Sequence, residues 1–454
     1  MTRRGVAACG VLCTAIAAVT VASHVPATAR VEVVVLLVLF AHLAWLTAIR
    51  GRPQRATVLH VTVLLVVLCA FARPVAEDDY WRFLWDAHRT LADGTPYGRA
   101  PAEWFGDPSL PPSVQAVLDG INHPDVPTIY GPVLQVLFVT AHGLAAADPS
   151  GLSLLFGALH LAGTFLALRF VPAHRVALAA WNPLLLQQCL MNLHPDFLLG
   201  WLLLAAAIAA RRGFAARTGA LLAVAVATKV SALVAVPVLW VAMAHRRGAG
   251  RAAMARAAAV GLVTLAVFYL PWLVTAATEG AGLATFAQTW RFNPALFAPL
   301  AALFGDATAR TVAAGVVGVA VLGLAAKATP RRAFGSVVLA IAVLLSLSPV
   351  INAWYLAWLL PCATMTRWRA PWVAAAALPL STLTVGELGL VGDSFAIPGG
   401  VVALQWMLVG GAVIADVVAR RHRHPEHSAR LTGESPEATR RSATGSVRGG
   451  DAVP

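Results

Sequence analysis

The residues best suited to chemistry form a short acidic and aromatic segment at positions 77–86, which reads EDDYWRFLWD. It opens with three adjacent carboxylates, Glu77, Asp78 and Asp79. Charged side chains of both signs follow at helical spacing: Arg82, Asp86 and Arg89. A carboxylate can take a proton from a hydroxyl group, and an arginine can hold a phosphate through paired hydrogen bonds. The segment therefore indicates group transfer at a hydroxyl. The alternative interpretation is a structural helix with ion pairs and tryptophan anchors.

The periodicity of this segment predicts one amphipathic helix on a membrane surface, ended by the stop signal Asp93-Gly94. At helical spacing Asp79, Arg82, Asp86 and Arg89 share a face. The apolar side chains beside them would rest among lipid headgroups: Trp81, Phe83 and Leu84. We therefore expect the carboxylates and arginines to be presented together at the lipid boundary.

Four other loops carry polar groups and are predicted on the same, outer side of the membrane as this segment. The candidates for binding substrate or phosphate in these loops are His123, Tyr130, His194, Asp196, Arg291, Asn352 and Tyr355. Simpler interpretations exist: a turn residue for His123, a helix cap for His194 and Asp196, and an aromatic belt for residues 352–355. Lys229 either pairs with phosphate or extends toward the membrane surface.

The composition predicts an all-α polytopic membrane protein. Hydrophobic residues make up 59% of the 454 positions, charged residues only 12%, and the mean hydropathy is +0.73, which exceeds what a soluble core can bury. Runs long enough to cross a bilayer recur and predict about 14 spans. The net charge of +13 comes from arginine clusters between these runs, which is typical of cytoplasmic turns and not of nucleic-acid binding.

The positions of the arginine clusters predict the topology. Residues 1–55 would form two N-terminal spans, with the turn 50–55 in the cytoplasm, and residues 74–150 a large outer loop. The chain is expected outside the membrane at residue 128 and in the cytoplasm at residue 169, so an odd number of crossings must lie between them. Because two apolar runs lie there, one of them does not cross, and we expect 129–147 to be a surface or re-entrant helix. The tail 420–454 is polar and predicted to be disordered, and both termini are expected in the cytoplasm of a multi-pass cell-membrane protein.

Several classes of chemistry lack their motifs. There is no P-loop, GxGxxG, HExxH or Ser/His/Asp spacing, and the five cysteines lie in apolar runs without metal-ligand spacing. We expect no cofactor, metal or nucleic-acid partner. Because activated nucleotides stay in the cytoplasm, outward-facing polar groups favour a lipid-borne substrate.

Taken together, these motifs resemble the GT-C glycosyltransferases, and in particular the actinobacterial polyprenyl-phosphomannose-dependent mannosyltransferases. The resemblance covers about residues 56–390 and is carried by DDYWRFLWD at 78–86, TPY at 95–97, INHPDVPTIYGP at 121–132, WNPL at 181–184, HPD at 194–196 and WYLAWLLP at 354–361. It implies a GT-C-like catalytic membrane domain at 56–419, with juxtamembrane helices in its first outer loop.

The resemblance also implies an activity: transfer of a sugar, with mannose favoured, from a polyprenyl phosphate to a cell-envelope glycolipid or polysaccharide outside the membrane, with inversion. Its pattern places the catalytic base at Asp79, with Asp78 as the close rival. Together with the loop candidates, four residues of the acidic and aromatic segment are expected to bind the substrate or its phosphate: Arg82, Trp85, Asp86 and Arg89. The rival functions are a transporter or flippase of a lipid-linked sugar, using the same carboxylates for proton coupling, and a scaffold for envelope assembly.

Overall fold

The chain folds into helices. The computed structural model describes residues 3–25, 30–246, 250–273 and 277–423, and these contain no strand, only an isolated bridge between Phe292 and Val350. The predicted all-α class is confirmed for this part of the chain. Of the tail 420–454, which was predicted to be disordered, residues 420–423 belong to a helix that ends at Arg423, and residues 424–454 lie outside the described residues.

Six helices are long and apolar enough to cross a membrane: α1 (Arg3–Ala22), α2 (Arg30–Arg50), α7 (Ser150–Leu168), α12 (Arg251–Leu273), α15 (Asp306–Ala326) and α19 (Gly399–Arg423). A seventh span results if η3 (Leu185–Met191) and α9 (Asp196–Arg212), which meet at 118°, form one broken span. These helices indicate a membrane protein. By length and composition they give six or seven spans, so the larger number expected from the sequence stays a prediction.

The other apolar runs form shorter helices: α3 (Arg55–Ala70), α6 (Pro132–Leu144), α10 (Ala215–Thr228), η4 with α11 (Val230–Ala235, Val236–Ala244), α16 (Ala333–Ser346), η5 (Ala353–Trp358), α17 (Leu360–Ala363), α18 (Ala370–Ala377) and η6 (Leu378–Thr382). Prolines stand at the first or second position of several of them, including Pro237, Pro361 and Pro379. Proline lacks the backbone donor that a continuing helix needs. Hydropathy alone therefore overestimates the length of these runs.

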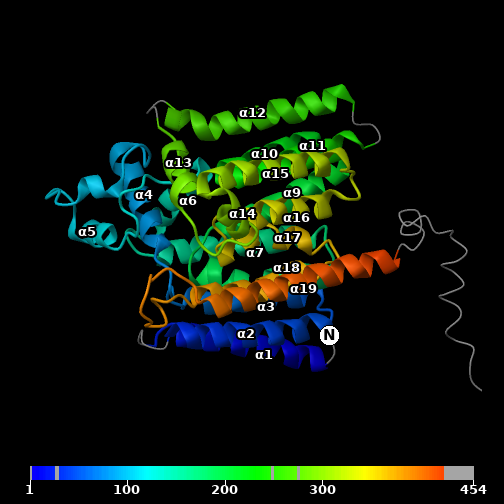
Figure 1. Cartoon of the computed structure of the whole chain (residues 1–454), viewed down its shortest axis with the longest axis horizontal. Coiled ribbons are helices and arrows are strands. Elements are labelled where there is room, and N and C mark those ends of the chain that lie inside the picture. The colour runs from blue at the N-terminus through cyan, green and yellow to red at the C-terminus, as the bar shows by residue number, and fades with distance from the viewer. Residues whose placement is uncertain (1–2, 26–29, 247–249, 274–276, 424–454) are drawn as a thin grey trace, which may run out of the picture.

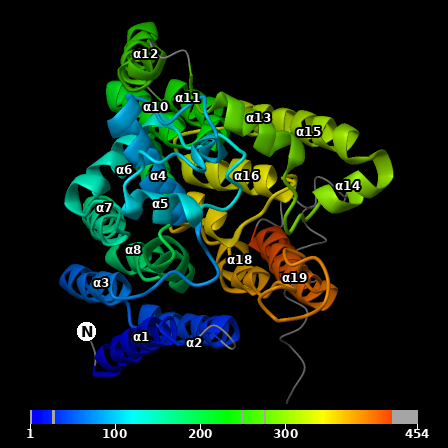
Figure 2. The same cartoon turned by 90° about the vertical axis from the view of Figure 1, so that its left-hand side faces the viewer.

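The helices lie side by side, with α4 (Asp79–Asp93) and α5 (Pro112–Asp119) protruding at one end (Figure 1). Seen from that end, α1 and α2 lie at one side of the bundle and α12 at the other (Figure 2). Helices α10 and α12 pack very closely, because a Cβ on Gly219 would lie 2.0 Å from the carbonyl oxygen of Ala257. Small residues permit such close approach where helices are apolar on all sides.

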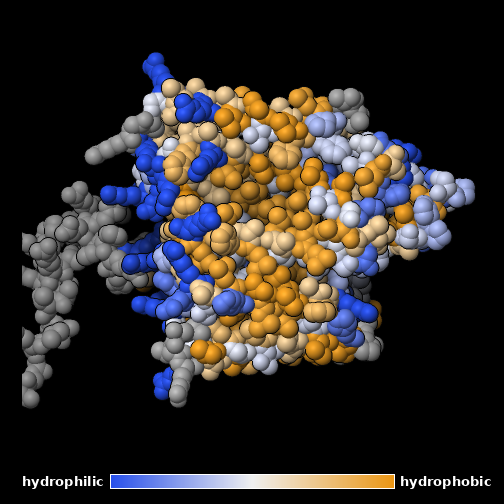
Figure 3. All heavy atoms as spheres, turned by 180° about the vertical axis from the view of Figure 1, so that it is seen from behind, coloured by the Kyte–Doolittle hydropathy of each residue, from blue (hydrophilic) through white to orange (hydrophobic). Residues whose placement is uncertain are grey.

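The molecular surface separates an apolar middle from two hydrophilic ends (Figure 3). At the end opposite α4, basic turns that are distant in sequence contact one another: Arg246 donates to the carbonyl of Arg211, and His245 bonds the carbonyl of Ala328 at 2.9 Å. Two polar ends around an apolar band match a bilayer, whose hydrocarbon core is ~30 Å thick.

Candidate active site

A polar cavity of about 990 Å³ lies at the end of the bundle that carries α4. Segments from many parts of the chain line it: residues 74–82, 122–130, 194–196, 229, 286–292, 350–355 and 381–395. The loops that were predicted to share one side therefore meet in one cavity. Two short helices, α13 (Gly280–Thr289) and α14 (Phe297–Phe304), lie near the 286–292 wall.

Helix α4 confirms the predicted helix but corrects its orientation. It begins at Asp79 and ends at Asp93, and the next residue, Gly94, has a φ of +75° that suits glycine. The charged face is not at a lipid boundary, because Arg82, Asp86 and Arg89 are all buried in the protein. Phe83 and Leu84, expected among headgroups, are buried as well. The charged face is buried because the loop after α5 supplies hydrogen-bond partners for it.

Arg82 organises that loop. Its guanidinium donates to the carbonyl oxygens of Val126 at 2.8 Å and His123 at 3.0 Å. His123 has a positive φ of +47°, a conformation that a non-glycine residue adopts only when its surroundings fix it. Arg82 lines the cavity, and both of its terminal nitrogens donate to the backbone there. These two bonds hold the backbone of the loop at His123, whose ring packs edge-on against Trp290.

Three of the predicted site residues hold α4 against residues 104–135 and do not line the cavity: Trp85, Asp86 and Arg89. Asp86 accepts hydrogen bonds from Thr128 and from Gln135, the latter at 2.9 Å. Burial raises the pKa of Asp86 to about 6, although nearby Arg82 and these two hydrogen bonds oppose the shift. Arg89 pairs with Asp93 and lies 4.5 Å above the Trp104 ring, which also packs against Trp85.

The carboxylates of the acidic segment meet two hydrogen-bond donors in the cavity. Asn122 Nδ2 donates to Asp78 and, at 3.3 Å, to Asp79 Oδ1, while the Tyr130 hydroxyl donates to Asp79 Oδ2 at 3.3 Å. The side chain of Asp79 is 27% exposed, against 13% for Glu77. Asp79 is thus oriented by two donors and still accessible from the cavity.

The carboxylates beside Asp79 hold protons more tightly than usual. Burial raises the pKa of Asp78, and the charge of Asp79 adds to the shift. Burial and the nearby carboxylates of Asp79, Asp78 and Glu387 raise the pKa of Glu77 well above its ordinary value. Glu387 has no sequence signal that would have placed it here, since it lies about 300 residues further along the chain.

His194 lies between two of these carboxylates. Its Nδ1 is 3.8 Å from Asp79 Oδ2, and its Nε2 is 3.6 Å from Glu77 Oε2. The imidazole is buried and stacked on Trp354, with ring centroids 3.7 Å apart. Asn192 ties this region to the start of the acidic segment through two hydrogen bonds with the backbone of Val75. Its side-chain oxygen accepts from the Val75 N–H at 3.0 Å, and its side-chain nitrogen donates to the Val75 carbonyl at 3.2 Å.

A buried ion pair forms another part of the cavity wall. Lys229 Nζ lies 2.6 Å from Asp196 Oδ1, and the Trp358 indole donates to the same carboxylate. The ammonium also lies over the rings of Tyr355 and Trp358, at 5.1 and 5.3 Å. Lys229 thus has a carboxylate partner from α9, which neither sequence interpretation had named.

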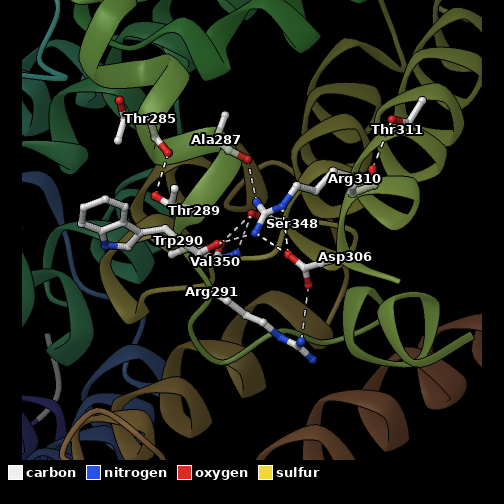
Figure 4. A network of polar contacts seen from close by, with 11 residues as sticks. Thr285, Ala287, Thr289, Trp290, Arg291, Asp306, Arg310, Thr311, Ser348 and Val350 are labelled. Atoms are coloured by element: carbon white, nitrogen blue, oxygen red, sulfur yellow. Dashed lines mark hydrogen bonds and ion pairs between the residues drawn. The ribbon is translucent and has the colours of Figure 1, made fainter. Parts of the chain in front are cut away.

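Arg291 comes from the opposite wall and belongs to a network with α15 (Figure 4). Its guanidinium is about half exposed and lies 3.4 Å from Asp306. Arg310, which the sequence did not single out, donates to the same carboxylate at 2.8 Å and to the carbonyls of Ala287 and Trp290. Arg310 therefore fixes the end of α13, and Arg291 retains an open side toward the cavity.

The structure thus brings most predicted residues together. The cavity is lined by Asp78, Asp79, Arg82, His123, Tyr130, His194, Asp196, Arg291, Asn352 and Tyr355. Within the described ranges, no three His, Cys, Asp or Glu side chains are grouped as a metal-ligand set. The chain matches no protein-family model, no curated protein and no solved structure.

Proposed function

We propose that this protein is an inverting glycosyltransferase that moves a sugar, with mannose favoured, from a polyprenyl phosphate to a hydroxyl of a cell-envelope glycolipid or polysaccharide. The observation that carries the proposal is the placement of Asp79, an accessible carboxylate held by Asn122 and Tyr130 in a polar cavity with cations on its other walls. The sequence resemblance to GT-C enzymes supports the same assignment.

The proposal includes the membrane topology. The cavity faces outward, the basic turns and both termini face the cytoplasm, and about 14 segments cross the membrane. The support is the observed separation between the cavity at one end and the basic turns at the other. In this arrangement the apolar flanks accommodate the polyprenyl chain, and α4 to α6 form the large outer loop with its juxtamembrane helices.

In the proposed reaction Asp79 takes the proton of the acceptor hydroxyl. The hydroxyl oxygen then bonds to the anomeric carbon from the face opposite the phosphate, which inverts the configuration. The bond between the anomeric carbon and the phosphate oxygen breaks, and its electron pair leaves with the phosphate. Arg291 and His123 are two of the cavity groups that face such an anion, and Lys229 also lines the cavity, although its charge is paired with Asp196.

The test is a transfer assay with purified protein in nanodiscs, radiolabelled polyprenyl-phosphomannose and a panel of envelope glycolipids. We expect Asp79→Asn to lower the transfer rate by about 10²- to 10⁴-fold, the usual contribution of a general base. Asp119→Asn is the matched control, because this exposed carboxylate bonds only Gln115 among the described residues. Full loss in Asp78→Asn with activity kept in Asp79→Asn would move the base to Asp78.

One observation favours a second candidate, a transporter of a lipid-linked sugar. The buried pair of Asp196 and Lys229 is the kind of intramembrane ionisable pair that often marks a transport path. A transporter would bind the labelled lipid, transfer no sugar to any acceptor, and move the label across the bilayer of proteoliposomes. That result would refute the glycosyltransferase.

A further inference from the structure

A second cavity, distinct from the polar one, is a narrow apolar slot of about 220 Å³ between α16, η5, α18 and α19. Its walls are aliphatic and aromatic, and the only charged side chains that line it among the described residues are Asp416 and Arg420. Nothing in the proposed transfer reaction uses this slot.

One face of α19 forms the long wall of the slot. The lining positions are Trp406, Val409, Val413, Asp416, Val417 and Arg420, which follow the helical repeat and therefore lie on one side of the helix. At 1.5 Å per residue, the 14 steps from Trp406 to Arg420 correspond to about 21 Å. Half of a bilayer that measures ~40–45 Å including its headgroups spans the same distance.

The charges at the slot lie at one end only. Arg420 stacks over the Trp368 ring at 4.3 Å, which holds the guanidinium at the slot mouth. Asp416 Oδ2 accepts hydrogen bonds from the backbone N–H groups of Arg369, at 2.7 Å, and Ala370, at 3.0 Å, so the carboxylate is occupied by the start of α18. Arg367 and Arg369 are exposed beside it. The mouth is therefore positive, and the interior is apolar.

We propose that the slot binds one acyl chain of an anionic phospholipid, with the headgroup phosphate at Arg420 and Arg369. A hydrocarbon chain matches the apolar walls, and a phosphate matches the uncompensated guanidinium groups at the mouth. The mouth belongs to the end of the molecule that carries the basic turns, opposite the polar cavity, so this lipid comes from the other leaflet than the proposed sugar donor.

The test uses delipidated full-length protein in detergent and native mass spectrometry during titration with phosphatidylglycerol or phosphatidylcholine of identical chains. We expect tighter binding of phosphatidylglycerol, and Arg420→Gln should weaken it about fivefold, the effect of one basic side chain near an anionic headgroup. Arg331→Gln, an exposed arginine outside the slot, should leave binding unchanged. Equal affinity for both lipids in the unsubstituted protein would overturn the assignment of the mouth.

The apolar interior of the slot is tested by a bulky substitution that fills it. Ala342 lines the slot on α16, and Ala342→Phe should reduce phosphatidylglycerol binding at least tenfold. The control Ala314→Phe adds the same side chain on an exposed position of α15. Thermal unfolding without lipid shows whether each variant is folded. Should folded Ala342→Phe bind phosphatidylglycerol as well as the control does, or should polyprenyl phosphate displace phosphatidylglycerol from the slot, the proposal is wrong.

Discussion

Replacing Lys229 by methionine tests the ion pair in the cavity wall. The ammonium nitrogen lies 2.6 Å from Asp196 Oδ1, and the carboxylate side chain is only 1% exposed. At an effective dielectric constant of ~20, the direct attraction at this separation is about 6 kcal/mol. Much of it offsets desolvation, but removing one partner of a buried pair typically costs about 3–5 kcal/mol because the other charge stays buried.

Two features place the expected cost near the lower limit. Lys229 is 16% exposed, so water can partly replace the ammonium, and the Trp358 indole still donates to the carboxylate. We therefore expect Lys229→Met to lower the free energy of unfolding by about 3 kcal/mol. In a chain of this length the melting temperature should fall by roughly 3–6 °C. Denaturant titration and thermal unfolding in one detergent measure both quantities.

The controls isolate the pair. Lys327 is the only other lysine of the chain and is exposed, so Lys327→Met should change the free energy of unfolding by less than about 0.5 kcal/mol. In an Asp196→Asn background Lys229→Met leaves no buried carboxylate without its partner, so the substitution should then cost less than about 1 kcal/mol. The reasoning is refuted if Lys229→Met is equally costly with Asp196 and with asparagine at that position.

Two further predictions concern the buried carboxylate of Asp86 in α4 and the packing of α10 against α12. The folded protein raises the pKa of Asp86 from 3.8 to about 6, so it binds this proton more tightly than the unfolded chain does; the resulting stability is present below about pH 4 and is lost as the pH rises through about 6. In the unsubstituted protein, the free energy of unfolding should therefore fall by roughly 3 kcal/mol between pH 4 and 7. Asp86→Asn should abolish this fall, whereas Asp119→Asn should leave it unchanged. Gly219→Ala should lower the melting temperature and broaden the size-exclusion peak, because its Cβ would overlap the carbonyl of Ala257; Gly315→Ala on α15, with nothing within 4 Å, should do neither. An unchanged Gly219→Ala protein would contradict the close packing of α10 and α12.

Local patterns predicted the elements of the site better than their contacts. Helical spacing and the Asp93-Gly94 stop predicted α4, and the arginine clusters placed the loops of His123, His194 and Asn352 on one side, where the structure brings them into one cavity. The burial of Arg82 was not predictable, because its acceptors are carbonyls 41 and 44 residues away and carbonyls carry no sequence signature.

The same limit applies to the apolar runs and to the partner of Lys229. Hydropathy measures how apolar a run is, but a single proline decides whether it continues as one helix, as the short pieces around Pro361 show. Lys229 and Asp196 are 33 residues apart on different helices, so their pairing depends on how α9 and α10 pack. Sequence spacing within one element cannot report such packing.

The double hydrogen bond between Asn192 and Val75 determines when the site can form during synthesis. The two residues are 117 positions apart, and at ~5–20 residues per second the ribosome needs roughly 6–23 s to make the intervening chain. During that time Glu77, Asp78 and Asp79 have neither His194 nor the tether from Asn192. The last wall of the cavity, near Phe395, follows about 200 residues later still. The acidic segment is thus among the first parts of the cavity to be synthesised, and its surroundings are complete only when nearly the whole chain has been inserted.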